Sequence, residues 1–232
     1  MMNRSSKNRL TERERFLFPT DSLFDNIGRA ICDAGFLPRK ELFEAWETAR
    51  RVRRLFRGGR IVELACGHGL AAHILLLLDN SSPEAIAADP AISDNAHRLS
   101  AILTERWPRL KDRVHLVKKP LQAVEILPDD LVLSVHACGE LTDMVIDKAA
   151  AAGARIAVLP CCHDVKGSDT GGLTGWLDGP LAVDVMRAVR LREMGYRILT
   201  KEIPKGVTPK NRLLMAEKLS ASNGGRNKSR KT

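Results

Sequence analysis

The sequence lacks an apolar run long enough to cross a membrane. Its most apolar stretch begins at Leu70, is interrupted at His73 and ends at Leu78, whereas a spanning helix needs about 20 apolar residues. No apolar segment follows the basic start M-M-N-R-S-S-K, so we predict no secretory signal. The five cysteines include no C-x-x-C pair, which favours reduced thiols over a disulfide framework. These absences predict a cytoplasmic protein with no membrane partner.

The positive charge lies at the two ends of the chain. The 232 residues carry a net charge of +9 and are 44% hydrophobic, enough for one sizeable α/β core. Residues 1–57 hold 13 Lys and Arg against 8 Asp and Glu, residues 205–232 hold 8 against 1, and the residues between hold 16 against 19. Basic ends around a neutral core predict a polyanionic partner, with RNA favoured. A solvated tail that contacts nothing is the alternative.

The residues from Arg60 to Asp89 have the pattern of a βαβ unit. The pattern predicts a buried strand at 61–65, a glycine turn at 66–69, an apolar helix at 70–78 and a second strand at 85–88. Gly67 and Gly69 lack a Cβ, so a ligand can lie against the backbone there. Asp89 ends the second strand, where its carboxylate can accept hydrogen bonds from both hydroxyls of a ribose. The unit therefore predicts a nucleoside ligand.

Two cofactors suit this unit. The segment G-H-G-L-A-A matches the dinucleotide fingerprint of NAD-binding enzymes. With Glu63 before it, the segment E-L-A-C-G-H-G resembles motif I of class I S-adenosylmethionine (SAM) methyltransferases. A carboxylate there would repel a pyrophosphate but attract the cationic amino group of SAM. We therefore predict SAM, and the expected cofactor-binding residues are Glu63, Ala65, Cys66, Gly67, Gly69, Asp89, Pro90 and His136.

Strands alternate with helices along the rest of the chain, which predicts a parallel sheet. The last two strands, expected at 196–203 and 212–217, are joined by a linker too short for a crossover, so they must be antiparallel. We predict an α/β, Rossmann-like fold: a mostly parallel seven-stranded sheet closed by an antiparallel C-terminal hairpin. The expected domains are a flexible basic N-terminus at 1–20, a helical extension at 21–57, the methyltransferase domain at 58–219 and a disordered basic tail at 220–232.

Some local details are also expected. Asp21 is predicted to cap a helix at 21–34, and Pro90 to open a helix that runs to about Trp107. The arginines between Arg50 and Arg57 lie on the helix predicted at 38–56, where they either meet phosphates beside the cofactor or form a solvated face. The glycine-rich stretch 167–179 is interpreted as a mobile flap over the cleft.

Three further segments carry a family resemblance: H-A-C-G-E-L-T-D at 136–143, P-C-C-H at 160–163 and T-P-K-N-R-L-L-M at 208–215. Together they resemble a branch of class I methyltransferases that bears H-x-C-G-x-L-T-D and P-C-C-H motifs. That branch is similar to tRNA 2′-O-methyltransferases of the acceptor stem. The resemblance covers about residues 38–218 and implies SAM-dependent methylation, with a tRNA ribose hydroxyl as the favoured acceptor. Those tRNA enzymes also carry amino-terminal zinc-finger segments, and this sequence has only Cys32 before Cys66.

The chemistry is expected at the ends of the fourth and fifth strands. Methyl transfer needs positioning, and a base where the acceptor loses a proton. The catalytic candidates are His136, His163, Asp143 and Cys161, with Glu140 and Cys162 beside them.

The cysteines of these segments allow three interpretations: a zinc site with His163, a nucleophile and helper pair, or buried packing. Adjacent cysteines are poor chelators of one tetrahedral ion, so packing is preferred and no metal site is predicted. Two other activities stay open, namely methylation of a protein side chain and a NAD-binding oxidoreductase. A non-enzymatic RNA reader is a further alternative.

Overall fold

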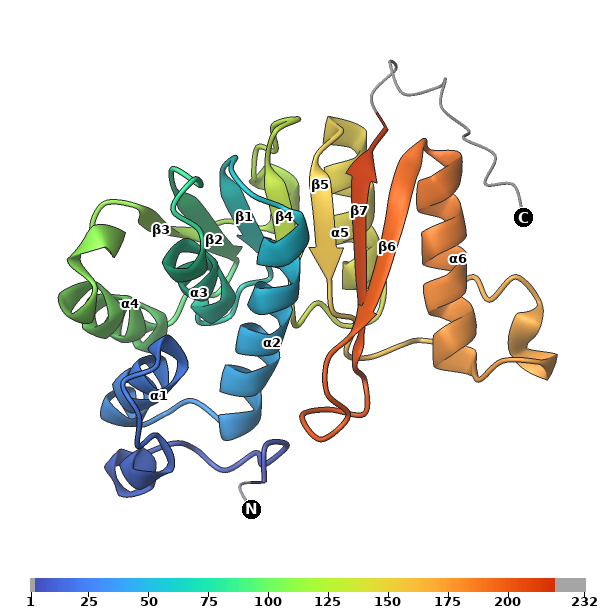
Figure 1. Cartoon of the computed structure of the whole chain (residues 1–232). Coiled ribbons are helices and arrows are strands. Elements are labelled where there is room, and N and C mark those ends of the chain that lie inside the picture. The colour runs from blue at the N-terminus through green and yellow to red at the C-terminus, as the bar shows by residue number, and fades with distance from the viewer. Residues whose placement is uncertain (1–2, 220–232) are drawn as a thin grey trace, which may run out of the picture.

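The computed structural model describes residues 3–219 (Figure 1). One seven-stranded sheet organises the chain, with the strand order β3-β2-β1-β4-β5-β7-β6. The strands are β1 (Ile61–Leu64), β2 (Ala85–Asp89), β3 (Val114–Lys118), β4 (Leu131–Ser134), β5 (Arg155–Val158), β6 (Tyr196–Glu202) and β7 (Arg212–Lys218). The first five strands pair in parallel, whereas β7 pairs antiparallel with both β5 and β6. The predicted fold class is confirmed.

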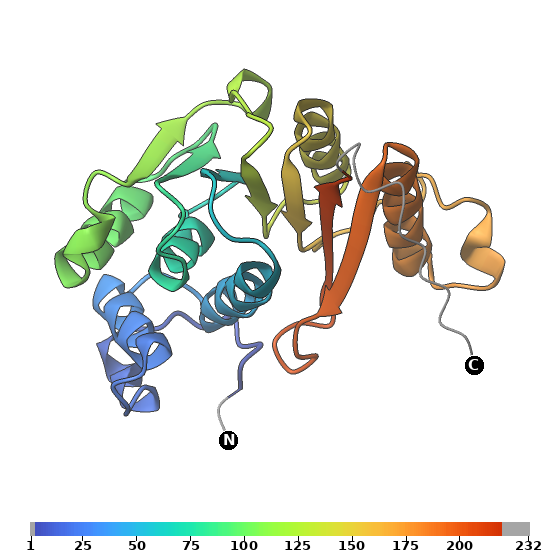
Figure 2. The ribbon, with the colours of Figure 1, turned by 45° about the horizontal axis from the view of Figure 1, so that its top comes forward.

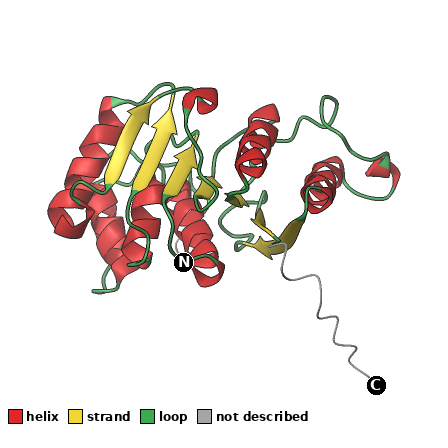
Figure 3. Cartoon of the chain, turned by 90° about the horizontal axis from the view of Figure 1, so that it is seen from above, coloured by secondary structure: helices red, strands yellow, loops and turns green. Residues whose placement is uncertain are grey.

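Helices cover both faces of this sheet, as Figures 2 and 3 show. The helices are α1 (Leu23–Ala34), α2 (Arg39–Leu55), α3 (Leu70–Leu78), α4 (Asp94–Arg106), α5 (Glu140–Ala152) and α6 (Gly179–Glu193). One core cluster packs the four helices α1, α2, α3 and α4 on one face of the sheet. A second cluster packs α5 and α6 on the other face. Every residue of β1 is buried, because side chains from both faces are covered. No helix among residues 3–219 is long and apolar enough to span a membrane.

Local capping explains where two helices begin. Asp21 was the expected cap of α1, but Ser22 fills that place, and its side chain accepts a hydrogen bond from the Asp25 amide. Likewise α4 begins at Asp94 behind the cap Ser93, and not at Pro90. Pro90 and Ala91 instead form a turn whose Ala91 amide is bound by the Asp89 carboxylate. Both sequence expectations were therefore wrong by a few residues.

The N-terminal segment packs against the rest of the protein more closely than its polar sequence predicts. Leu10 and Phe18 are buried, and a short 3₁₀ helix (Glu12–Leu17) lies between them. The backbone of residues 6–10 pairs with residues 37–40, at the beginning of α2. This pairing holds the segment against the amino end of α2. The basic tail predicted at 220–232 lies outside the described residues.

The glycine-rich stretch does not lie over the cleft. It contains a 3₁₀ turn (Leu173–Gly175) and the exposed Trp176. In Figure 1 it extends beyond α6, at the end of the sheet far from the turn after β1. The expected flap over the cleft is therefore wrong in its placement, because the stretch packs against α6, where a Cβ on Gly171 would meet the Met186 side chain.

Candidate active site

The turn between β1 and α3 forms the centre of the candidate site. Gly69 adopts a left-handed backbone with φ of 71°, and a Cβ there would come within 3.1 Å of the Ala87 side chain, so glycine is required. Gly67 is exposed, and a Cβ built on it would meet nothing within 4 Å. Ala65 also has a positive φ, of 52°. The turn thus leaves open space directly beside its backbone.

Asp89 lies across this turn, at the tip of β2. Its carboxylate accepts hydrogen bonds from the Gly67 amide at 3.2 Å and from the Ala91 amide at 2.9 Å. The Cys66 amide donates to the Ala88 carbonyl, so the turn and the strand end are tied together. A carboxylate held by two amides keeps further lone pairs for hydroxyl donors. The open backbone at Gly67 and this fixed acceptor fit a nucleoside such as that of SAM. Pro90 is exposed directly behind the acceptor.

Glu63 lies beneath the turn and not in the open space. It is 2% exposed, and its carboxyl accepts a hydrogen bond from the Ala72 amide at 2.8 Å. Burial raises the pKa of Glu63 to about 8, against the opposite effect of the Ala72 bond. Cys66 is buried beside it, and burial raises the pKa of its thiol as well. Glu63 therefore braces the first turn of α3 from below.

Two residues that the sequence did not single out connect the turn to α2. His68 Nδ1 lies 3.1 Å from a Glu41 carboxylate oxygen, and its ring packs on Phe36 with centroids 5.1 Å apart. These contacts place the amino end of α2 at the carboxyl edge of the sheet. An acid in the first turn of a helix and a histidine a few residues past a strand are common surface features, so no sequence signal marked the pair.

The catalytic candidates fall into two groups. In the first group, His136 is partly exposed just after β4, and the Cys161 thiol lies 3.8 Å from the His136 carbonyl. In the second group, the His163 side chain is 2% exposed and its Nε2 lies 2.7 Å from Asp184. Asp143 belongs to this second group through Arg187, which binds both Asp143 at 2.7 Å and Asp184 at 3.2 Å.

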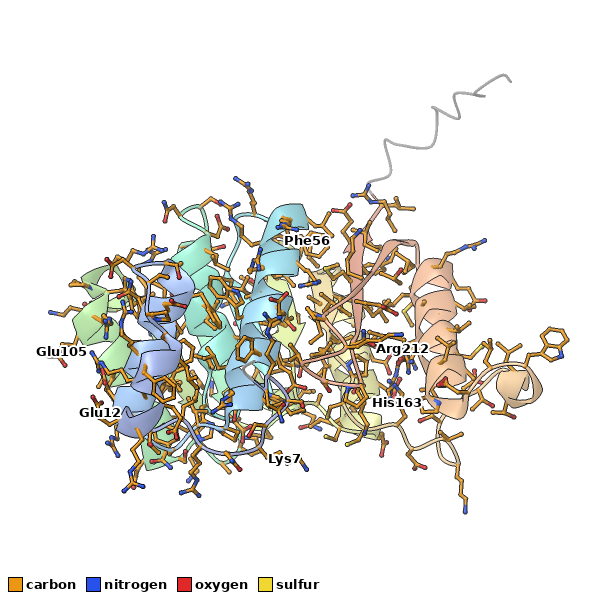
Figure 4. The ribbon with its side chains drawn as sticks, turned by 60° about the horizontal axis from the view of Figure 1, so that its bottom comes forward. Lys7, Glu12, Phe56, Glu105, His163 and Arg212 are labelled. Carbon is orange, nitrogen blue, oxygen red and sulfur yellow. The ribbon has the colours of Figure 1, made fainter. Side chains whose placement is uncertain are left out.

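Figure 4 shows His163 beside Arg212, which also binds Asp184, at 2.7 Å. The Nε2 atom of His163 is thus occupied, and its Nδ1 is buried without a partner among the described residues. Asp143 is held by Arg187 and, at 3.2 Å, by Arg190. In this arrangement His163 holds the loop after β5 against α6 and Asp143 joins α5 to α6, whereas His136 and Cys161 lie at the accessible edge. The role of Asp184 was not visible in the sequence.

Two arginines of α2 are bound to backbone carbonyls of neighbouring segments. Arg51 donates to the Glu202 carbonyl at 2.8 Å, and Arg53 donates to the Leu78 carbonyl at 2.7 Å. Figure 4 shows Phe56, at the far end of α2, well separated from Lys7, which lies near its amino end. Arg51 and Arg53 thus fasten α2 to its neighbours, whereas Arg54 and Arg57 are exposed. Contact with phosphates and a solvated face both stay open for these arginines.

Other cations surround the carboxyl edge of the sheet. Exposed lysines lie on the N-terminal segment, at the end of β3 and on the β6–β7 turn: Lys7, Lys118, Lys119, Lys205 and Lys210. By contrast, a hollow of about 630 Å³ between α5 and α6 is lined by six acids and two arginines: Glu140, Asp143, Asp147, Asp164, Asp169, Glu193, Arg187 and Arg190. A polyanion would be attracted to the lysine side and repelled from the hollow.

The sheet order, the glycine turn and the closing hairpin together define a Rossmann-like class I methyltransferase fold. A family model described as a methyltransferase domain matches residues 46–166, which are 121 of the 232 residues. The chain therefore belongs to this methyltransferase-domain family. No curated protein matches the chain.

Solved structures share the fold at low sequence identity. An O-methyltransferase family protein from Burkholderia thailandensis is 16% identical with a TM-score of 0.52, over 91% of this chain and 64% of that one. The mitomycin 7-O-methyltransferase MmcR is 18% identical with a TM-score of 0.50, over 78% of this chain and 57% of that one. The M1A22 tRNA methyltransferase TrmK of B. subtilis is 14% identical with a TM-score of 0.49, over 74% and 65%.

Proposed function

We propose that this protein transfers the methyl group of SAM to RNA, with a ribose hydroxyl of tRNA as the favoured acceptor. The observation that carries the proposal is the Gly67 and Asp89 arrangement, an open site with the exposed Lys118 and Lys119 beside Asp89. The segments at 136–143 and 160–163 resemble a branch of class I methyltransferases that is similar to tRNA 2′-O-methyltransferases, and this resemblance supports the choice of tRNA.

Cofactor binding is assigned to the turn after β1 and to the tip of β2. The Asp89 carboxylate accepts hydrogen bonds from the ribose hydroxyls, and the backbone from Ala65 to Gly69 lies against the nucleoside. Glu63 acts from beneath by bracing α3 at Ala72. Bound SAM supplies an electrophilic methyl group on a sulfonium. This family membership and the closing hairpin favour SAM over NAD.

The acceptor hydroxyl loses its proton to His136 in this proposal. His136 is partly exposed at the end of β4, beside the cofactor edge, and the described residues give its side chain no hydrogen-bond partner. The oxygen–carbon bond to the methyl group forms as the sulfur–carbon bond breaks, and the hydroxyl proton passes to the imidazole. His163 is assigned a positioning role, because its Nε2 is bound to Asp184.

RNA binding is assigned to the lysine side of the carboxyl edge. Lys7, Lys118 and Lys205 come from three separate segments and are all exposed. Phosphate contacts made by such lysines weaken as salt rises, because bound counterions are released on binding. The acidic hollow between α5 and α6 disfavours the opposite approach.

The first test measures SAM and NADH binding by calorimetry, followed by transfer of labelled methyl from SAM to total RNA and to total protein. We expect SAM to bind, NADH not to bind, and label to enter small RNA. Label that enters protein alone would replace RNA by a protein side chain as the acceptor. Absence of SAM binding would refute the assignment of the turn at Gly67.

A charge-reversal pair tests the RNA surface. Lys118→Glu with Lys119→Glu should weaken RNA binding at low salt and reduce the salt slope by about 2, because each lysine neutralises about one phosphate. Lys111→Glu is the matched control, because Lys111 is also exposed but precedes β3, at the opposite edge of the sheet. An equal effect of the control would show that net charge, and not this surface, governs RNA binding.

A further inference from the structure

Three cysteine thiols meet at the carboxyl edge of the sheet. The Sγ atoms of Cys138, Cys161 and Cys162 all lie within 4.8 Å of one another. Cys138 and Cys162 are exposed, and Cys161 is partly exposed. The three are therefore accessible, unlike Cys32 and Cys66, which are buried.

The loops that carry the thiols are fastened to each other and to the body. The Gly139 amide donates to the Cys162 carbonyl at 2.9 Å, which joins the loop after β4 to the loop after β5. Gly139 has φ of 57° and ψ of −130°, a conformation that favours glycine. Thr142 Oγ1 donates to the Ala137 carbonyl at 2.7 Å, and His163 is held by Asp184. The cluster is thus built by backbone and side-chain contacts on both of its sides.

The adjacent pair Cys161 and Cys162 does not diverge as it would on a regular strand. β5 ends at Val158, so both residues lie in irregular backbone, where both thiols face Cys138. The sequence argues against a metal site because neighbouring cysteines are poor ligands for one ion. This backbone geometry removes that argument. The Lys210 ammonium lies 3.6 Å from Cys162 Sγ and balances negative charge there.

We propose that Cys138, Cys161 and Cys162 bind one thiophilic metal ion, such as Zn²⁺, through three thiolates, with the fourth coordination position open to solvent. Sulfur lies about 2.3 Å from zinc, so sulfurs on one tetrahedral ion are about 3.8 Å apart. The Sγ atoms of Cys138 and Cys161 lie 2.6 Å apart and all three pairs lie within 4.8 Å, so metal binding requires the Cys138–Cys161 pair to separate by about 1 Å. Binding releases the thiol protons to solvent. Three protein ligands with an open fourth position are typical of reactive zinc sites, and closed four-ligand sites are typical of structural ones.

The experiment uses reduced full-length protein free of chelators. Cd²⁺ is titrated, with the thiolate-to-cadmium charge-transfer absorbance as readout, and Zn²⁺ affinity is measured by competition with a chromophoric chelator. We expect one equivalent bound, and each of Cys138→Ser, Cys161→Ser and Cys162→Ser to weaken affinity at least tenfold. Cys32→Ser is the matched control, because Cys32 is buried in α1. It should bind metal as the unmodified protein does.

A second measurement needs no variant. Zn²⁺ should slow alkylation of the three clustered thiols, mapped by peptide mass spectrometry, and leave the labelling of Cys32 and Cys66 unchanged. Failure of the unmodified protein to bind either metal would overturn the proposal. So would equal losses in the Cys32→Ser control, or a protein mass lower by two hydrogens with no metal bound, which would indicate a disulfide between Cys138 and Cys161. None of these readouts depends on SAM or RNA, so this test and that of the proposed function can fail separately.

Discussion

Replacing Glu63 by glutamine should make the protein increasingly more stable than the unmodified chain as pH rises. Burial raises the pKa of Glu63 from its ordinary 4.5 to about 8 in the folded state. Between these two values the folded protein holds a proton that the unfolded chain has lost, so the free energy of unfolding falls as pH rises. Glutamine does not ionise, and it can still accept the hydrogen bond from Ala72.

The magnitude follows from the separation of the two pKa values. Each pH unit between the two pKa values lowers the free energy of unfolding by at most about 1.4 kcal/mol. Ionisation of Glu63 in the unfolded chain therefore lowers this free energy by up to about 3 kcal/mol at pH 7. At pH 5 the same cost is below about 1 kcal/mol. The difference between Glu63→Gln and the unmodified protein should therefore grow steadily from pH 5 to pH 8. Other groups, including the buried His73, are the same in both proteins and cancel in the difference.

Urea unfolding followed by circular dichroism at pH 5, 6, 7 and 8 provides the assay, and the comparison at pH 5 is the internal control. A difference that stays constant with pH, or that shrinks as pH rises, would refute the buried and protonated state of Glu63. The same variant also separates two roles in SAM binding. Bracing from beneath the turn predicts a loss of affinity below about threefold, whereas a direct charge contact with the amino group of SAM predicts a loss above about tenfold.

The other predictions concern the site itself. Asp89→Ala should weaken SAM binding at least tenfold in calorimetry, because the acceptor for the ribose hydroxyls is removed; Asp94→Ala, at the exposed start of α4, is the control and should bind normally. His136→Ala should lower methyl transfer about a hundredfold and leave SAM affinity unchanged, as expected for loss of a general base; unchanged turnover would exclude His136 as the base. His163→Ala should lower the free energy of unfolding by about 1–3 kcal/mol, because a buried hydrogen bond to Asp184 is lost, and reduce turnover less than His136→Ala. A larger loss of turnover with unchanged stability would reverse these two roles.

Much of the fold could be predicted from local patterns. Mostly apolar runs mark β1 and β4 as buried strands, although Glu63 interrupts the first. Gly35 and Gly153 end their helices in left-handed conformations. The short linker before Arg212 requires an antiparallel hairpin. The positions of Gly67 and Asp89 were also predictable, because the ends of neighbouring parallel strands meet at one edge.

The assignment of roles within the site depended on the tertiary structure. Sequence spacing treats His136 and His163 alike, but only α6 brings Asp184 to His163, and Asp184 is 21 residues away from it. The same holds for the thiols, because Cys138 meets Cys161 and Cys162 through two loops joined at Gly139. The identity of a residue determined which chemistry it can perform. Its burial and partners, which come from segments distant in the chain, decided whether it braces the fold or faces the ligand.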